Sequence, residues 1–409
     1  MKSVWILNHY AQEPGGPGGT RHYSLARALR QNGWSASLIA ASTEHGTGRE
    51  RLAQEESRRL DYYDEVPFLW LRTAAYAGNG TDRIKNMLGY TFAVLKSENV
   101  RGLRPPDIVV GSSVHPFAAW AGLRLARRYR VPFVFEVRDL WPQTLVDLGR
   151  LSDSHPMTLA LRWLERYLYS QASKIIVLLP RAGEYIEPLG VPADKIVWVP
   201  NGIELDIFPV PTAKVPSDRF TLMYFGAHGT ANGLDNVIKA MDEVRKMEPN
   251  NAIHLRIIGD GPLKADLIKL AKDLELSTVS FEAPVPKKQI AQLASEADAF
   301  VFNLIDAPVF KYGISSNKLF DFMACGRPVI FSCDAGNNPV ETAGGGTTVA
   351  AGNPPALAQA MIDLANLSPD ERQSMGEANR KHIEDHYEFK LLAARFAAAL
   401  DLAVLDVSG

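Results

Sequence analysis

Residues 311–331 read KYGISSNKLFDFMACGRPVIF, and this stretch decides the fold expected for the rest of the chain. Ser315 and Ser316 are residue types that favour a helix start. The apolar residues from 319 to 324 supply the buried faces of a short helix, and Gly326 ends it. The apolar run 329–331 then reads as a strand. The pattern predicts one helix-to-strand unit of an α/β domain.

The start of this predicted helix has the features of an anion site. A helix N-terminus carries free N–H groups and about half a positive charge. Lys318 adds an ammonium in the first turn, so phosphate is the natural ligand. Asp321 falls one turn after Asn317 on the same face, where a carboxylate accepts hydrogen bonds from sugar hydroxyls. The alternative is an ordinary helix with a charged first turn.

Length and composition describe a globular protein of more than one domain. The chain has 409 residues, which indicates two or three domains. Apolar residues make up 46% and charged residues 22%, so the chain is not disordered. The net charge of −2 gives no indication of a nucleic-acid partner.

Cysteine usage and hydropathy indicate a reducing compartment. Cys325 and Cys333 are the only cysteines, so a disulfide scaffold is not expected. The first residues hold too short an apolar run for a signal peptide. The most apolar stretch, residues 391–405, is interrupted by Arg395 and Asp401. We expect a cytoplasmic protein that at most touches the inner face of the plasma membrane.

Two segments of the first half favour contact with an anionic membrane. Arg124, Arg127, Arg128 and Arg130 cluster on one predicted helix, and residues 82–96 are amphipathic. Lys and Arg also outnumber Asp and Glu in the first half of the chain, and the reverse holds in the second half. The alternative is a basic face that is simply solvated.

Predicted strands and helices alternate along most of the chain. This alternation is typical of doubly wound α/β domains with parallel sheets, and here it occurs twice. Residues 44–85 do not fit it and read as polar and irregular. The predicted organisation is a first domain over residues 1–204, a proline-rich linker over 205–219, a second domain over 220–387, and a C-terminal helix over 388–409 that crosses back to the first domain.

In such folds ligands bind at the carboxyl ends of the strands. If the two domains oppose these ends, both sets of loops face one interdomain cleft. The first domain then offers Gly18, Gly19, His115 and Asp139. The second domain offers Gly226, His228, Gly229, Thr230, Gly259, Asp260, Gly261, Glu282, Ala283, Gly313, Ser315, Ser316, Asn317, Lys318, Leu319 and Asp321.

Several kinds of catalytic site have no counterpart in the sequence. The nine histidines lack the spacing of metal ligands, so we expect neither a metal nor a cofactor. A nucleophile elbow and a Walker A loop are also missing. His115 and Asp139 are candidate site residues. The alternative for His115 is a loop histidine that bonds only the backbone, and the alternative for Asp139 is a structural ion pair.

The motifs together resemble the family-4 retaining glycosyltransferases, which have the GT-B fold of two Rossmann-like domains. KYGISSNKLFDFMACGRPVI resembles the C-terminal signature of that family. FEVRDLWP combined with SSNKLFDFMA is similar to the branch that builds bacterial surface polysaccharides, of the fucosamine-transferase kind. The supporting motifs are YFGAHGTANGLDNVIKA (224–240), IIGDGPLK (257–264), VWVPNGIELDIF (197–208) and FEVRDLWPQ (135–143).

The resemblance implies a reaction and its substrates. A sugar moves from a nucleotide sugar, of the UDP-sugar kind, to a sugar or lipid-linked acceptor in exopolysaccharide, O-antigen or capsule assembly. The anomeric configuration is retained and no metal takes part. A GT-B nucleotide-sugar 2-epimerase and a catalytically silent nucleotide-sugar-binding protein are the alternatives.

The resemblance also implies roles for individual residues. Asp321 takes the place of the second acid of the E-x7-E pattern, which holds the ribose hydroxyls. Asn317 and Lys318 reach the diphosphate or the sugar, and Leu319 to Asp321 lie along the nucleotide. Base and ribose are lined by Gly259 to Gly261 and by Glu282-Ala283. The candidate catalytic residues are His115, Lys318 and Asp139.

The sequence departs from the family pattern at two places. Gly313 stands where relatives have the first glutamate of E-x7-E. Ala227 and Asn232 stand where many relatives have an Arg and a Lys. Charge opposite the phosphates is therefore expected from Lys318, with Lys311, and from helix N-termini.

Overall fold

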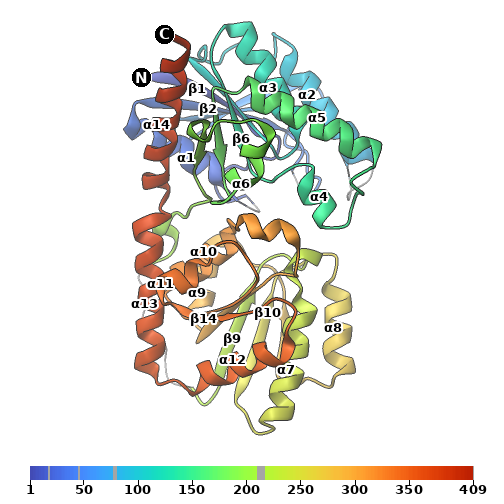
Figure 1. Cartoon of the computed structure of the whole chain (residues 1–409), viewed down its shortest axis with the longest axis vertical. Coiled ribbons are helices and arrows are strands. Elements are labelled where there is room, and N and C mark those ends of the chain that lie inside the picture. Colours follow the sequence, from blue (N-terminus) through green and yellow to red (C-terminus); the bar gives the residue numbers. More distant parts are fainter. Residues whose placement is uncertain (17–18, 45–46, 77–80, 210–216, 409) are drawn as a thin grey trace. The chain divides into compact units, whose positions relative to one another are not determined.

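The computed structural model describes residues 1–16, 19–44, 47–76, 81–209 and 217–408 (Figure 1). It consists of two compact units. Gly18 and residues 210–216 of the predicted linker lie outside the described residues. Unit 1 contains Met1–Asn201, Tyr312–Ser315 and Phe389–Gly409, and unit 2 contains Gly202–Lys311 and Ser316–Glu388.

Unit 1 is built on an 8-stranded sheet with the order β3-β4-β2-β1-β5-β6-β7-β8. All neighbouring strands are parallel except β3 and β4. The strands are β1 (Lys2–Leu7), β2 (Trp34–Ala41), β3 (Arg58–Tyr63), β4 (Val66–Leu71), β5 (Ile108–Ser112), β6 (Phe133–Val137), β7 (Lys174–Val177) and β8 (Ile196–Trp198). The helices are α1 (Arg21–Leu29), α2 (Thr81–Leu95), α3 (Pro116–Tyr129), α4 (Gln143–Asp147), α5 (Pro156–Gln171), α6 (Gly183–Ile186) and α14 (Phe389–Ser408).

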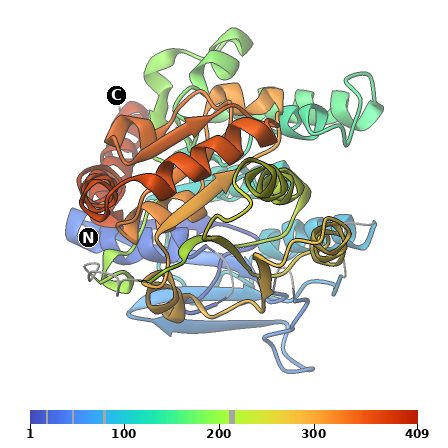
Figure 2. The same cartoon turned by 90° about the horizontal axis from the view of Figure 1, so that it is seen from below.

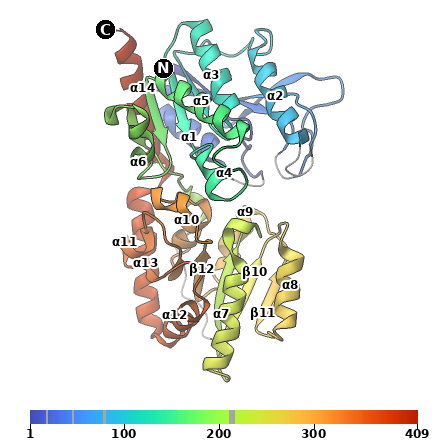
Figure 3. The same ribbon diagram turned by 45° about the vertical axis from the view of Figure 1, so that its right-hand side comes forward.

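Helices cover both faces of this sheet. One core cluster joins the sheet to α2, α3 and α5, which Figure 3 shows on the same side of the unit. The other cluster joins the opposite face to α1 and α14. From α14, Phe389, Leu392, Phe396 and Leu400 enter this second core. The C-terminal helix, which the sequence predicted to cross back, is therefore an integral part of unit 1.

The antiparallel hairpin β3–β4 lies in the segment that the sequence analysis left irregular, and that interpretation was wrong. Residues 58–63 pair with residues 66–71, and Asp64 and Glu65 form the two-residue turn. Both turn residues have positive φ angles, 44° and 63°. Such a turn matches the twist of a hairpin.

Unit 2 has a 6-stranded, fully parallel sheet with the order β11-β10-β9-β12-β13-β14. Helices α7 and α12 pack side by side on it (Figure 2). The strands are β9 (Phe220–Phe225), β10 (Ile253–Ile258), β11 (Val279–Glu282), β12 (Ala299–Asn303), β13 (Val329–Ser332) and β14 (Gly346–Val349). The helices are α7 (Leu234–Met247), α8 (Lys264–Asp273), α9 (Lys287–Ala294), α10 (Asn317–Ala324), α11 (Pro339–Ala343), α12 (Pro354–Asn366) and α13 (Pro369–His386).

Helix α10 is the helix predicted from the opening motif. Leu319, Phe320 and Phe322 are buried, and the ring of Phe322 stacks on that of Phe300 in β12 at 4.9 Å. The helix ends at Ala324, Cys325 is its C-cap, and Gly326 follows with a φ of 62°. This burial fixes the helix against the sheet and so fixes the direction in which its N-terminal residues point.

Candidate active site

The candidate site of unit 2 lies where the strand order of its sheet reverses. Strands β9 and β12 are neighbours, but β10 follows on one side and β13 on the other. Crevices outside the carboxyl ends of strands at such a reversal are the usual ligand sites of open α/β sheets. The loop after β9 and the first turn of α10 both meet there, through Gly226 and Lys318.

Lys318 is the central cation of this site. Its ammonium donates to the hydroxyl of Tyr224 at 2.8 Å and to Oδ1 of Asn232. It also lies 4.8 Å from the centre of the Tyr224 ring, a cation–π contact. Both oxygens are neutral, and burial lowers the pKa of Lys318 to about 7. The ammonium of Lys318 is thus partly buried and has neutral hydrogen-bond partners.

Two glycine turns beside Lys318 pack against each other. The N–H of His228 donates to the carbonyl of Asp260 at 2.8 Å. A β-carbon at Gly261, whose φ is 158°, would stand 2.7 Å from the nitrogen of His228. A β-carbon at Gly259, with a φ of 141°, would stand 2.0 Å from the carbonyl oxygen of Gly226. These glycines are needed because backbone approaches backbone closely.

His228 is fully buried between these turns. Among the described residues, no hydrogen-bond partner is found for either nitrogen of its ring. Burial, and to a lesser extent Lys264 and Lys318, lowers the pKa of His228, so its ring is neutral at pH 7. A buried polar group without a partner is costly, which makes His228 a candidate for contact with a ligand.

The loop after β9 continues into a 3-10 turn at Thr230–Asn232, preceded by Gly229. The side-chain amide of Asn232 donates to the carbonyl of Ala227 at 2.8 Å. Its carbonyl oxygen is the one that accepts from Lys318. Asn232 therefore links this loop to α10 rather than supplying a charge.

The other predicted residues of unit 2 contribute in different ways. Ser316 is the N-cap of α10 but makes no side-chain cap bond. Leu319 is completely buried, so only its main chain is accessible to a ligand. The half-buried side chains of Asn317 and Asp321 lie on α10, and Ala283 is exposed after β11. Glu282 is held in a bidentate ion pair by Arg256, at 2.7 and 2.9 Å.

Gly313 and Ser315 belong to unit 1, although α10 follows them directly. Asn201 fixes this segment: its N–H donates to the hydroxyl of Ser315 at 2.8 Å, and its side-chain amide to the Ser315 carbonyl at 2.6 Å. Gly313 has a φ of 101°. A side chain at this angle is strained, so glycine suits this position.

In unit 1, the carboxyl ends of β1 and β5 bring two histidines together. His115 caps α3 through Nδ1, which accepts from the N–H of Ala118 at 3.2 Å. Its Nε2 therefore carries the proton and donates to Nδ1 of His9 at 2.7 Å. The His9 ring stacks on Tyr90 at 4.5 Å. Burial, with a smaller effect of Arg83, lowers the pKa of His115 to about 3.

The buried acid of unit 1 is Glu136, which the sequence analysis missed. Arg21 donates two hydrogen bonds to its Oε1, both at 3.0 Å, and His22 donates to its Oε2 at 2.5 Å. Burial opposes ionisation, but His22 and Arg21 outweigh it and hold the pKa of Glu136 well below its ordinary value. Asp139, the predicted acid, is exposed instead. Gly19 is also exposed.

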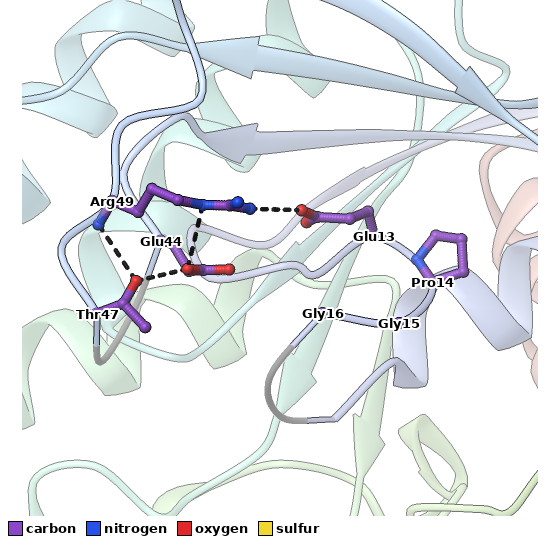
Figure 4. Close-up of a pocket in the computed structure, with 7 residues that line it drawn as sticks. All are labelled: Glu13, Pro14, Gly15, Gly16, Glu44, Thr47 and Arg49. Carbon is purple, nitrogen blue, oxygen red and sulfur yellow. Dashed lines mark hydrogen bonds and ion pairs between the residues drawn. The ribbon is translucent and has the colours of Figure 1, made fainter. Parts of the chain in front are cut away.

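Unit 1 also contains an open pocket of about 380 Å³, formed by the loops after β1 and β2. Figure 4 shows the Arg49 guanidinium beside two carboxylates, those of Glu13 and Glu44. Beneath them, buried Arg51 donates to Glu13 at 2.7 Å. The pocket thus presents carboxylate, guanidinium and hydroxyl groups, which suit a polyhydroxylated ligand. It is lined by Glu13, Pro14, Gly15, Gly16, Glu44, Thr47 and Arg49.

Within the described residues, no group of three or more His, Cys, Asp or Glu side chains is placed so that it could hold a metal ion. Within those same residues, none of the helices is both long and apolar enough to span a bilayer.

Residues 16–202 match the family described as "Glycosyl transferase 4-like domain", and residues 219–366 match "Glycosyl transferases group 1". The two matches follow one another and together span most of the chain. The chain is a glycosyltransferase with a glycosyl transferase 4-like domain followed by a group 1 domain. The match of the second family includes Lys318, and that of the first includes His115 and Glu136.

Curated relatives of this glycosyltransferase come from bacteria. "Probable glycosyltransferase WbjE" of Pseudomonas aeruginosa is 23% identical over 67% of this chain and 69% of its own. "Putative colanic acid biosynthesis glycosyltransferase WcaL" of Escherichia coli is 25% identical over 53% of each chain. A GDP-mannose-dependent phosphatidylinositol monomannoside mannosyltransferase of Corynebacterium glutamicum is 27% identical over 41% of this chain and 43% of its own.

Solved structures show the fold of this glycosyltransferase. Sucrose-phosphate synthase of Thermosynechococcus elongatus superimposes with a TM-score of 0.74 at 17% identity, covering 97% of this chain and 98% of its own. Anabaena HepE, solved with UDP and glucose, superimposes with a TM-score of 0.68 at 14% identity, covering 98% of this chain and 100% of its own. WaaG, from lipopolysaccharide biosynthesis, superimposes with a TM-score of 0.67 at 15% identity, covering 96% of this chain and 99% of its own. The predicted GT-B fold is confirmed.

Proposed function

We propose that this glycosyltransferase moves a sugar from a UDP-sugar to a saccharide or lipid-linked acceptor during assembly of a bacterial surface polysaccharide. The configuration at the anomeric carbon is retained, and no metal takes part. The observation that carries this proposal is Lys318, a half-buried lysine whose ammonium has neutral hydrogen-bond partners at the start of α10. Such a cation is suited to the negative charge of a nucleoside diphosphate.

The names of the relatives support the choice of substrates. One is named for colanic acid biosynthesis, and HepE was solved with UDP and glucose. Another relative depends on GDP-mannose, so the experiment below includes GDP as well as UDP. We place the reaction in the cytoplasm, at the inner face of the membrane, where nucleotide sugars and lipid-linked acceptors meet.

The proposed reaction exchanges one bond at the anomeric carbon for another. The bond to the diphosphate oxygen breaks, and a bond to the acceptor oxygen forms on the same face of the sugar. The acceptor proton passes to the departing phosphate oxygen. Lys318 and the free N–H groups at the start of α10 stabilise the growing negative charge, and removing one such donor costs about 3 kcal/mol of barrier.

His115 is not the base in this scheme. Its Nε2–H is donated to His9, and its pKa of about 3 leaves the ring neutral. Its place is that of a positioning residue, which holds the start of α3 and the loop after β5. The polar pocket of unit 1, with Glu13, Glu44 and Arg49, is the proposed site for acceptor hydroxyls.

The test is a thermal-shift screen of the full chain against UDP, GDP, ADP and their common sugar conjugates. A nucleotide that binds only the folded state stabilises it by about 2.7 kcal/mol at 100 times its Kd. We expect UDP and UDP-sugars to raise the Tm most, and Lys318→Ala to abolish the shift. Lys269→Ala, an exposed lysine of α8, serves as the control.

A shift that is absent for every nucleotide, or that persists unchanged in Lys318→Ala, contradicts the proposal. Incubation of the bound nucleotide sugar with and without saccharide acceptors then identifies the reaction. Transfer with the donor's anomeric configuration, read by NMR, supports a retaining transferase. Formation of a 2-epimer without an acceptor would identify an epimerase instead.

A further inference from the structure

Large apolar side chains are exposed on the outer surfaces of α2 and α5. On α2, Ile84, Leu88 and Phe92 follow one another at four-residue intervals, so they form one stripe along the helix. On α5, Met157, Leu159 and Trp163 are exposed, and Trp163 is 67% accessible. Apolar side chains gathered in this way on a folded unit mark an interaction surface.

Helix α3 lies between these helices and joins them into one surface. The guanidinium of Arg128 donates to the carbonyl of Leu95 at the end of α2, at 2.7 Å. That of Arg127 donates to Gln171 at the end of α5, also at 2.7 Å. Arg127 further lies 5.9 Å from the ring of Tyr167, which stacks on Trp163 at 5.6 Å. The α2–α3–α5 face is therefore continuous, as the side of unit 1 in Figure 3 illustrates.

The charge of this face has one predominant sign. Among the described charged side chains of the three helices, the exposed cations are Lys85, Arg124, Arg127, Arg128 and Arg166, and the exposed anion is Asp82. Cations thus stand between and beside the exposed apolar groups. Long basic side chains direct their charge to lipid headgroups while their methylene stems remain in apolar surroundings.

We infer that the α2–α3–α5 face docks this glycosyltransferase onto an anionic lipid bilayer. Basic residues interleaved with Trp, Phe and Leu are the composition of helices that lie in a membrane interface. Anionic headgroups attract basic side chains near the membrane surface, and Arg124, Arg127 and Arg128 lie on α3 between the two apolar helices. The inference deepens the proposed function, because it names the surface that brings unit 1 to a lipid-linked acceptor.

The test is flotation of the full chain with vesicles, which does not depend on catalysis. Vesicles of phosphatidylcholine with 30% phosphatidylglycerol, roughly the anionic fraction for which a polybasic surface responds strongly, are compared with pure phosphatidylcholine. We expect binding to the anionic vesicles that weakens at high salt. Arg124→Gln/Arg166→Gln is expected to weaken it about 25-fold, since each cation contributes about fivefold.

The apolar contribution is tested with Phe92→Ser/Trp163→Ser, which is expected to weaken binding at least tenfold even at low salt. Matched controls remove the same groups elsewhere: Lys269→Gln/Lys272→Gln on α8 and Leu402→Ser/Leu405→Ser on α14, all exposed. These controls are expected to bind as the wild type does. Brominated lipids should quench the tryptophan fluorescence of the wild type more than that of Trp163→Phe.

Three results would overturn the inference. One is binding to neutral and anionic vesicles alike, and another is binding that the face variants leave unchanged. The third is a lipid-free dimer that Phe92→Ser/Trp163→Ser dissolves, because a second copy would then cover this face. The thermal shift with UDP is measured on the same variants. A variant that no longer floats with the vesicles but keeps its thermal shift with UDP separates membrane docking from nucleotide binding. Each of the two proposals can therefore fail without the other.

Discussion

The side chain of Lys318 lies directly against the backbone of Gly226. A β-carbon at position 226 would stand 3.0 Å from Cδ of Lys318 and 3.1 Å from Cε, and the φ of Gly226 is 144°. The lysine therefore reaches Tyr224 and Asn232 across a glycine of the loop after β9. In this chain, a cation from α10 therefore lies beside that loop.

This contact predicts that Gly226→Ala weakens nucleotide binding. The new methyl group would push Lys318 aside, and alanine is strained at this φ angle by about 1–3 kcal/mol. We expect the Kd for UDP to rise at least tenfold, measured by calorimetry. Gly344→Ala has the same kind of strain, with a φ of 66°, but no atom within 4 Å. It should lose stability while keeping its affinity for UDP, and equal losses of affinity in both variants would refute the explanation.

The lowered pKa of Lys318 predicts a dependence of nucleotide binding on pH. Its pKa is lowered to about 7, so the lysine loses its proton as the pH rises above 7 in the free protein. A diphosphate favours the charged form, so binding takes up protons. We expect the Kd for UDP to increase between pH 7 and pH 9 and the binding enthalpy to vary with the ionisation enthalpy of the buffer. The Lys318→Met variant should bind weakly with neither effect, and an identical pH profile in both proteins would contradict the assignment.

The same pKa shift affects stability with a defined sign. Between about pH 7 and 10.5 the unfolded chain holds a proton on Lys318 that the folded chain has lost, so stability rises with pH in this range. Lys318→Met removes that dependence. The free energy of unfolding of the wild type should therefore rise relative to that of Lys318→Met from pH 7 to pH 10, as measured in urea.

The cluster of Arg21, His22 and Glu136 predicts a large loss of stability when one member is removed. Arg21 and Glu136 are both at most 1% exposed in their side chains. Breaking a buried ion pair on one side costs about 3–5 kcal/mol, because the remaining charge stays buried. We expect Glu136→Gln to lower the free energy of unfolding of unit 1 by this amount. Asp235→Asn breaks an exposed pair with Lys239 and should cost less than about 1 kcal/mol.

Glu165 in α5 predicts a loss of stability as the pH rises from acidic to neutral. Burial raises the pKa of this carboxyl to about 7, although Tyr169 and Tyr185 donate to it, each at 3.1 Å. The folded state therefore binds a proton that the unfolded state releases between pH 4.5 and 7, and stability falls as the pH rises through this range. From pH 5 to pH 9, the wild type should lose about 3 kcal/mol more than Glu165→Gln. Parallel curves for the two proteins would show that the carboxyl is already ionised.

The sequence predicted the two doubly wound sheets because a parallel sheet needs long apolar strands separated by amphipathic helices. It did not predict the β3–β4 hairpin, because the turn is Asp64-Glu65 rather than the Asn-Gly or Asp-Gly of common hairpin turns. Nothing local in that pair of residues indicates positive φ angles. The hairpin is stabilised by its pairing with β2, a contact between distant segments.

The residues of the candidate site were likewise predicted from the sequence only in part. Lys318 and the glycine turns were identified because their chemistry is local: a helix start, and turns that tolerate no side chain. Glu136 was missed because its neighbours Arg21 and His22 are more than a hundred residues away. Glu282 was read as a ligand residue, but its partner Arg256 lies on the adjacent strand. Pairings of this kind appear only once the strand order is known.

Helix α14 closes the second core of unit 1, yet it follows all strands and helices of unit 2 in the sequence. During synthesis, β1 and α1 are made long before α14, so one apolar face of their sheet remains uncovered until α14 has been made. Unit 2 has all of its own strands and helices before α14 emerges. Unit 1 of this enzyme can therefore complete its folding only after residues 389–408 have been synthesised, and a nascent chain stalled before residue 389 should need a chaperone for that unit alone.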